Sequence, residues 1–185
     1  MPPLETPSVN TAFKAYDFHL LGVDGKYHSI SSVNTTNGLV IAFVCNHCPY
    51  VQSIAHKIAR DANDLQKIGI GFIAINSNDV NTYPDDSYDN MKIFAQKHQW
   101  NFPYLFDETQ KVAKEYDAVC TPDFFGFNKG LELQYRGRLD SAGKNDFPNA
   151  ERELYNTMKM IFHKKDINDI KQYPSIGCSI KWKNS

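Results

Sequence analysis

The chain has 185 residues, and its 20 basic and 21 acidic side chains give a formal net charge of −1. That length is enough for one domain with its own hydrophobic core. We expect a single domain over residues 1–185, in which residues 1–14 and 174–185 form extended tails. The balanced charge argues against nucleic acid as a partner.

Targeting and membrane segments are not evident in the sequence. No apolar run approaches the ~18–20 residues that a membrane-spanning helix needs, so no membrane partner is predicted. Residues 1–15 are polar and contain proline, and they lack the basic start and the apolar stretch of a secretory signal. The sequence therefore predicts a cytoplasmic location.

Strand and helix signals alternate through the first half of the chain. Two short β-like runs within residues 15–33 meet at Asp24-Gly25, a dipeptide that suits a tight hairpin. The continuous apolar run 39–44 predicts a strand that is buried on both faces. The apolar residues after it follow the spacing of an amphipathic helix over 51–65, which we expect to end near Gly69.

The second half continues this alternation. The run 72–75 predicts another buried strand, and the runs 124–127 and 131–135 predict a second hairpin. Three further helices are predicted, over 91–98, 112–116 and 154–162. This order of elements predicts an α/β fold with a mixed central sheet and helices on both faces. The polar stretches 78–89 and 140–149 are predicted to be surface insertions.

Two of the four cysteines, Cys45 and Cys48, form a C-x-x-C pair between the first buried strand and the long helix. In a reducing compartment such a pair is more typical of catalysis or metal binding than of a structural disulfide. The first turn of a helix has unpaired N–H groups and a positive dipole end, which favour a thiolate. We expect Pro49 in that first turn. We also expect Cys45 to be the more exposed, more acidic nucleophile and Cys48 the resolving thiol.

The two residues between the cysteines are expected to tune the pair. His47 can stabilise a thiolate by hydrogen bonding and by charge, which makes the disulfide a better oxidant. Asn46 is the second residue to which we assign a tuning role. The alternatives are a loop histidine with little effect, two buried inert cysteines, or one half of a zinc knuckle. Cys120 and Cys178 stand alone in the sequence, without a second knuckle, so no metal site is predicted.

Thr121-Pro122 directly precedes the apolar run 124–127, and this region carries part of a family resemblance. The segments that carry it are FVCNHCPYV (43–51), AINSND (74–79), FPYL (102–105), CTPDFF (120–125) and YRGRLD (135–140). Together they resemble the peroxiredoxin-like branch of the thioredoxin superfamily, related to the alkyl hydroperoxide reductase and thiol-specific antioxidant proteins. The resemblance covers residues 15–182.

This resemblance implies a thioredoxin-like fold with an N-terminal β-hairpin extension and an inserted β-α unit. It also implies that Pro122 follows a cis peptide bond and faces the cysteines. Thr121 and Pro122 would then position a bound thiol or peptide. Cys120 would lie near the active site, since it is two residues before Pro122.

The sequence departs from the patterns of both related families. A peroxiredoxin with Cys48 as its peroxidatic cysteine carries P-x-x-x-T-x-x-C, whereas this chain has Ile41 and Cys45 at the proline and threonine positions. The segment 120–122 replaces the arginine of that family, so rapid peroxide reduction is not expected. The buried aspartate of thioredoxin is Leu39 here, which leaves no proton-handling group identified from the sequence.

We therefore predict a thiol–disulfide oxidoreductase that uses Cys45 and Cys48 and needs no cofactor. Its expected partners are protein or small-molecule disulfides and thiols, with a thioredoxin or glutathione system as electron donor. One alternative is a thiol-dependent peroxidase in which Cys48 is peroxidatic and Cys45 resolving. Another is a thioredoxin-fold metal-binding module without turnover. Cys120 and Cys178 are candidates for a second redox pair or relay, which requires Cα atoms within ~7 Å.

Overall fold

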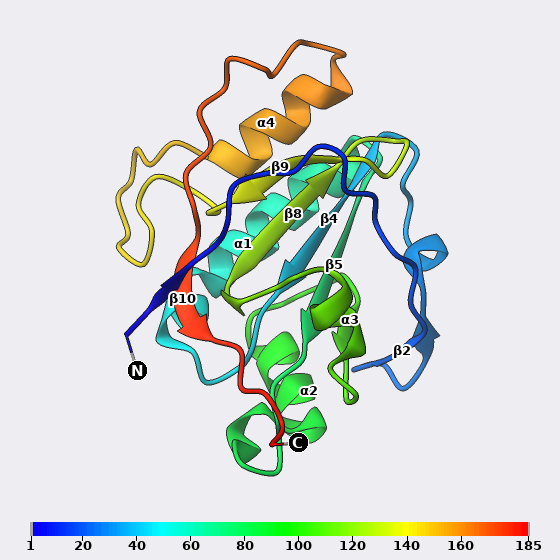
Figure 1. Ribbon diagram of the computed structural model, residues 1–185, viewed down its shortest axis with the longest axis vertical. Coiled ribbons are helices and arrows are strands. Elements are labelled where there is room, and N and C mark those ends of the chain that lie inside the picture. The colour runs from blue at the N-terminus through cyan, green and yellow to red at the C-terminus, as the bar shows by residue number, and fades with distance from the viewer. Residues whose placement is uncertain (1, 185) are drawn as a thin grey trace.

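A computed structural model describes residues 2–184 of the chain (Figure 1). Its elements in chain order are β1 (Leu4–Glu5), β2 (Leu20–Gly22), β3 (Tyr27–His28), the 3-10 helix η1 (Ile30–Ser32), β4 (Gly38–Phe43), α1 (Pro49–Lys67), β5 (Ile70–Asn76), the 3-10 helix η2 (Pro84–Asp86), α2 (Tyr88–Lys97), β6 (Tyr104–Phe106), α3 (Lys111–Glu115), β7 (Cys120–Thr121), β8 (Asp123–Phe127), β9 (Leu133–Gly137), α4 (Glu153–Phe162) and β10 (Ile176–Ser179). The predicted strands and helices are all present.

The centre of the fold is a mixed sheet that, among residues 2–184, has the strand order β3-β2-β6-β5-β4-β8-β9. Strand β4 pairs in parallel with β5 and antiparallel with β8. The predicted N-terminal hairpin, β2 and β3, adds to the edge of the sheet through an antiparallel pair between β2 and β6. The predicted second hairpin is the antiparallel pair of β8 and β9. These pairings confirm the mixed α/β sheet.

Strand β4 separates two hydrophobic layers, and all six of its residues are buried. Successive side chains of a strand point to opposite faces of the sheet. Val40 and Ala42 belong to the layer that contains apolar residues of α1, α2 and α4. Leu39, Ile41 and Phe43 belong to the layer that contains α3 and part of the N-terminal segment. Helices therefore cover both faces of the sheet, as predicted.

The two tails, expected only to be extended, pair with each other. Strand β1 lies antiparallel to β10, and β10 in turn lies antiparallel to β7. Figure 1 shows the red C-terminal segment beside the blue N-terminal strand, across the end of the central sheet where α1 begins. The polypeptide near residue 178 is thereby fixed against the segment that precedes Pro122. Within residues 2–184, no helix combines the length and the apolarity that crossing a bilayer requires.

Candidate active site

The two thiols of the C-x-x-C motif lie where β4 ends and α1 begins. Helix α1 starts at Pro49 and has Cys48 as its N-cap residue, which confirms proline in the first turn. Cys45 precedes the N-cap by three residues. Cys45 therefore lies outside the helix, and its position does not support the expectation that it is the more acidic of the two thiols. The positive end of the α1 dipole acts on Cys48.

Exposure does not distinguish the two cysteines as predicted. Neither Cys45 nor Cys48 has exposed surface, so the expectation that Cys45 is the more exposed thiol is wrong. Burial raises the pKa of Cys45 well above its ordinary value, and the hydrogen bond to Cys48 and the charge of Asp86 act in the same direction. Cys48 is thus the thiol whose surroundings favour ionisation.

Cys48 is surrounded by donors that stabilise a thiolate. The thiol of Cys45 contributes most, and the backbone N–H and the thiol of Cys178 and the backbone N–H of Val51 add to it. These hydrogen bonds outweigh the cost of burial and lower the pKa of Cys48 to about 5. Cys48 is therefore the reactive sulfur that this arrangement favours.

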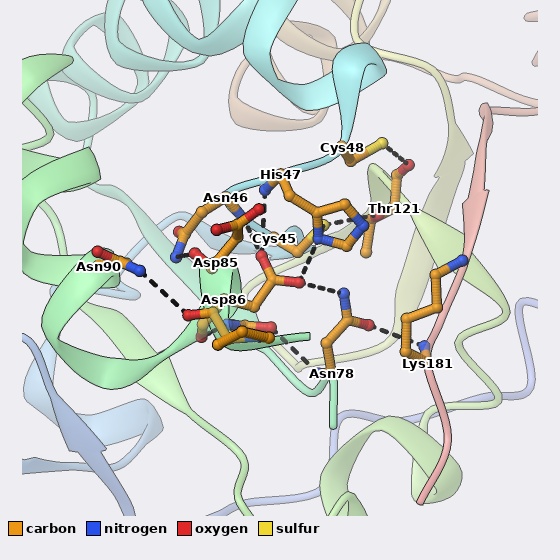
Figure 2. Close-up of polar contacts among 12 residues, drawn as sticks. Cys45, Asn46, His47, Cys48, Asn78, Asp85, Asp86, Asn90, Thr121 and Lys181 are labelled. Atoms are coloured by element: carbon orange, nitrogen blue, oxygen red, sulfur yellow. Dashed lines mark hydrogen bonds and ion pairs between the residues drawn. The ribbon is translucent and has the colours of Figure 1, made fainter. Parts of the chain in front are cut away.

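Thr121 contacts both sulfurs and precedes the cis proline Pro122, which confirms the prediction of a cis bond. Its hydroxyl lies 3.4 Å from Sγ of Cys45. Its carbonyl oxygen lies 3.2 Å from Sγ of Cys48, where a protonated Cys48 donates a hydrogen bond (Figure 2). The structure thus brings together Cys45, Cys48 and Thr121, three of the residues that the sequence singled out.

Asp86 is the member of the site that the sequence analysis missed. It lies in the stretch 78–89, which was predicted to be a surface insertion, yet its side chain has no exposed surface. Oδ1 accepts hydrogen bonds from the backbone N–H groups of Asn46 and His47, at 2.7 and 3.1 Å. Oδ2 accepts from Nδ2 of Asn78 at 2.8 Å. This buried carboxylate holds the loop between the two cysteines.

His47 forms an ion pair with that carboxylate. Its Nδ1 lies 2.5 Å from Oδ2 of Asp86 and only 3.9 Å from Sγ of Cys45 (Figure 2). The hydrogen bond to Asp86 raises the pKa of His47. Burial acts to raise the pKa of Asp86, but the hydrogen bonds from His47 and Asn78 outweigh it and lower that pKa. An imidazolium and a carboxylate therefore lie beside the two thiols.

Asn46 contacts neighbouring segments rather than either sulfur. Its side-chain amide donates to the carbonyl oxygen of Asp85 at 3.1 Å and accepts from the hydroxyl of Tyr104 at 2.8 Å. Its own carbonyl oxygen accepts from Gln52 at 2.9 Å. These contacts fix the path of the loop, so any influence of Asn46 on the thiols is indirect.

The remaining cysteines lie on either side of the strand pair β7–β10. Cys178 is opposite Thr121 in the register, and Ser179 is opposite Cys120. Residues opposite one another share a face of the sheet, whereas neighbours along a strand point to opposite faces. The thiol of Cys120 is buried and directed to the carbonyl oxygen of Pro122 at 3.8 Å. This register gives no support to a Cys120–Cys178 pair and places Cys178 opposite Thr121, the residue that contacts both Cys45 and Cys48.

Cys45, His47 and Asp86 each offer one donor atom of a kind that binds metal ions, and these atoms lie within 4.8 Å of one another. The hydrogen bond between His47 and Asp86 accounts for two of the three donors. The arginine nearest in the sequence to the cis proline, Arg136, is also engaged, because its guanidinium pairs with the buried carboxylate of Asp123 at 2.9 Å. The charged groups near the two thiols are thus paired within the protein, His47 with Asp86 and Arg136 with Asp123.

A mixed sheet covered by helices on both faces, with two thiols at the start of α1 and a cis proline beside them, defines a member of the thioredoxin superfamily. The chain belongs to the AhpC/TSA family, whose model matches residues 12–137. This confirms the family resemblance. A search of curated proteins finds no match.

Solved structures similar to the chain agree with this assignment. An uncharacterized conserved protein from Geobacillus kaustophilus is 43% identical with a TM-score of 0.94, over 100% of this chain and 98% of that one. A hypothetical protein from Sinorhizobium meliloti 1021 is 32% identical with a TM-score of 0.91, over 98% and 99%. The thioredoxin domain of a thiol-disulfide oxidoreductase from Bacteroides vulgatus shares the fold, with 13% identity and a TM-score of 0.64 over 84% and 99%.

Proposed function

We propose that this protein is a thiol–disulfide oxidoreductase in which Cys48 is the nucleophile and Cys45 the resolving thiol. The observation that carries the proposal is the position of the two sulfurs. Both contact Thr121, and Cys48 is the N-cap residue of α1, at the positive end of the helix dipole. This reverses the roles that the sequence suggested, because Cys48 and not Cys45 is the N-cap residue of α1.

The reaction has two exchange steps. The Cys48 thiolate attacks a sulfur of the substrate disulfide, forms a mixed disulfide and releases the first substrate thiolate. Cys45 then loses its proton and attacks Sγ of Cys48, which forms the Cys45–Cys48 disulfide and releases the second substrate thiolate. Two electrons pass from the protein dithiol to the substrate, and the two released thiolates take up protons.

The second step needs a group that accepts the proton of Cys45. Burial and the charge of Asp86 keep Cys45 protonated in the resting site. The His47–Asp86 pair is the acid–base group nearest to its sulfur, and Nδ1 of His47 is 3.9 Å away. We assign to this pair the proton transfer for which the sequence offered no residue: Nδ1 of His47 passes its proton to the Asp86 carboxylate as it takes up the proton of Cys45.

Protein or low-molecular-weight disulfides are the proposed substrates, and a thioredoxin or glutathione system in the cytoplasm is the proposed source of electrons. A hollow with a volume of about 290 Å³ is lined by Tyr50, Pro122 and Ile176, which are close in the sequence to Cys48, Thr121 and Cys178. It offers space for the part of a substrate next to its disulfide.

Glutathione disulfide tests the proposed order of events in a single turnover that is quenched with acid and read by mass spectrometry. The reduced protein should form the Cys45–Cys48 disulfide. The Cys45→Ser/Cys178→Ser variant, which lacks both thiols that neighbour Cys48, should retain one glutathione on Cys48, and the Cys48→Ser variant should not react. A Cys120→Ser variant, altered outside the pair, should behave like the unmodified chain. Trapping on Cys45 in the Cys48→Ser variant would reverse the assignment, and unchanged turnover in both variants would exclude it.

Two measurements separate this proposal from its alternatives. A peroxidase with Cys48 peroxidatic would oxidise rapidly when the reduced protein is mixed with hydrogen peroxide in a stopped-flow instrument, whereas the proposed function predicts slow oxidation. A metal-binding module would retain a stoichiometric ion after purification under reducing conditions, and elemental analysis would detect it. We expect neither result.

A further inference from the structure

Cys178 lies against the same sulfur as Cys45. Its side chain packs against the apolar cluster that contains Cys45 and Cys48, and its backbone N–H and thiol are among the groups that lower the pKa of Cys48. Its opposite residue in the β7–β10 register is Thr121, whose carbonyl oxygen and hydroxyl contact Cys48 and Cys45. Three thiols on two distant parts of the chain therefore meet around one residue.

The backbone of β10 lies close to the backbone of β7 beside Cys178. Gly177 lies so close to Thr121 that a Cβ atom at this position would be 1.9 Å from the carbonyl oxygen of Thr121. Further along the tail, the N–H of Ile180 donates to the carbonyl oxygen of Val119 at 3.1 Å. The N–H of Lys181 donates to Oδ1 of Asn78 at 2.9 Å, and Asn78 also contacts Asp86 (Figure 2). The strand that carries Cys178 is thus fixed on both sides of the cysteine.

Exposure separates Cys178 from the other two thiols. Cys45 and Cys48 have no exposed surface, whereas Cys178 is only partly buried. A disulfide that includes Cys178 would therefore be closer to solvent than one between Cys45 and Cys48. Any reductant that meets the folded protein would reach it first.

We propose that Cys178 is a third redox thiol, which exchanges with the Cys45–Cys48 disulfide to form a Cys48–Cys178 disulfide. This rests on the proposed function, because it starts from the disulfide which that reaction produces. Cys178 attacks Sγ of Cys48, the Cys45–Cys48 bond breaks, and Cys45 leaves as a thiolate that receives the proton lost by Cys178. The exchange is an isomerisation, so no external oxidant or reductant is consumed. It moves the disulfide from the buried pair to the partly exposed tail.

Variants that remove one partner at a time test this exchange. The wild type, Cys45→Ser, Cys178→Ser and the double variant Cys45→Ser/Cys178→Ser are oxidised with one equivalent of the thiol oxidant diamide. They are then quenched with acid, alkylated and mapped as non-reduced peptides. Circular dichroism checks that each variant is folded. We expect Cys45→Ser to form the Cys48–Cys178 disulfide and the double variant to form no disulfide at Cys48. The wild type should contain both the Cys45–Cys48 and the Cys48–Cys178 disulfides.

The result in each variant has a separate meaning. Loss of the Cys48–Cys178 peptide from both the wild type and Cys45→Ser would overturn the third-thiol proposal. A Cys48–Cys120 peptide in Cys45→Ser would overturn it as well, since Cys178 would then not be the neighbour of Cys48. The Cys178→Ser variant should still form the Cys45–Cys48 disulfide, and failure there would count against the proposed function instead. The wild type keeps the test valid if Cys45→Ser does not fold.

Discussion

Nδ1 of His47 lies 2.5 Å from Oδ2 of Asp86, and this contact joins the loop between the two cysteines to a carboxylate 39 residues further along the chain. The same carboxylate accepts the backbone N–H groups of Asn46 and His47. It therefore holds the loop and, in the mechanism that we propose, also orients the histidine that moves the proton of Cys45.

Replacing Asp86 with asparagine should separate these two roles. The Asp86→Asn side chain can still accept the backbone N–H groups, but it carries no charge to pair with His47. We expect the raised pKa of His47 to fall toward its ordinary value, which NMR titration of the imidazole will show. The resolving step should slow by about 10²–10⁴-fold, the range for loss of a general acid–base group.

The matched control for this change is Asp85→Asn, because Asp85 is the exposed neighbour of Asp86 in η2. It should keep both the histidine pKa and the rate of single turnover. If Asp86→Asn leaves the pH–rate profile unchanged, the His47–Asp86 pair does not move the proton of Cys45.

The reduced protein should contain one thiolate at mildly acidic pH. The pKa of Cys48 is lowered to about 5, so ultraviolet thiolate absorbance should rise with a midpoint near that pH and be absent from Cys48→Ser. The Cys45→Ala variant, which removes the largest stabilising donor, should shift the midpoint upward. A midpoint that persists in Cys48→Ser would instead identify Cys45 as the acidic thiol.

This titration also predicts a pH dependence of folding. The pKa of Cys48 is about 5 in the folded protein, against a reference value of 9.0. A lowered pKa stabilises the folded state fully above the reference value, and the stabilisation is lost as the pH falls through the folded-state value. The stability advantage of the reduced wild type over Cys48→Ser should therefore shrink as the pH falls from 9.0 to about 5, which urea unfolding will measure.

Much of the fold is predictable because its signals are local. The run 39–44 is apolar on both faces and becomes the central strand, and the apolar spacing over 51–65 becomes the inner face of α1. The cis bond at Pro122 followed from the family resemblance and not from its surroundings in the sequence. Patterns with a period of a few residues therefore specify the elements and their order.

The site was less predictable because it depends on distant contacts and on where one helix starts. Asp85 and Asp86 are alike in sequence, yet the chain path buries only Asp86. A helix that begins at Pro49 makes Cys48, and not Cys45, the N-cap residue, which changes the expected nucleophile. The pairing of Cys178 with Thr121 joins β10 to β7, and no local pattern in a tail indicates such a partner.

The buried ion pair between Asp123 and Arg136 should be important for stability. Both side chains are almost fully buried, and Arg136 also lies over the ring of Phe125. Asp123→Asn leaves the guanidinium without its charged partner and should lower the free energy of unfolding by about 3–5 kcal/mol. Replacing both residues, as Asp123→Leu with Arg136→Met, should cost much less, because no buried charge is left unpaired. Urea unfolding of the reduced proteins measures both changes, and equal losses would show that packing rather than charge dominates.

Gly177→Ala should move the C-terminal strand away from the thiols. The new Cβ atom would lie 1.9 Å from the carbonyl oxygen of Thr121, and because both groups belong to paired backbones, β10 has to shift. Cys178 then moves its N–H and thiol away from Cys48, so the pKa of Cys48 should rise. The same shift uncovers the sulfur of Cys48, so iodoacetamide should label it faster at a pH where the thiol is fully ionised.

The control is Gly130→Ala in the distant hairpin, where the nearest atom belongs to the Asn128 side chain at 3.3 Å. Labelling of buried Cys120 should stay slow, which separates a local displacement from global unfolding. Unchanged labelling of Cys48 in Gly177→Ala would mean that the tail does not control access to that sulfur.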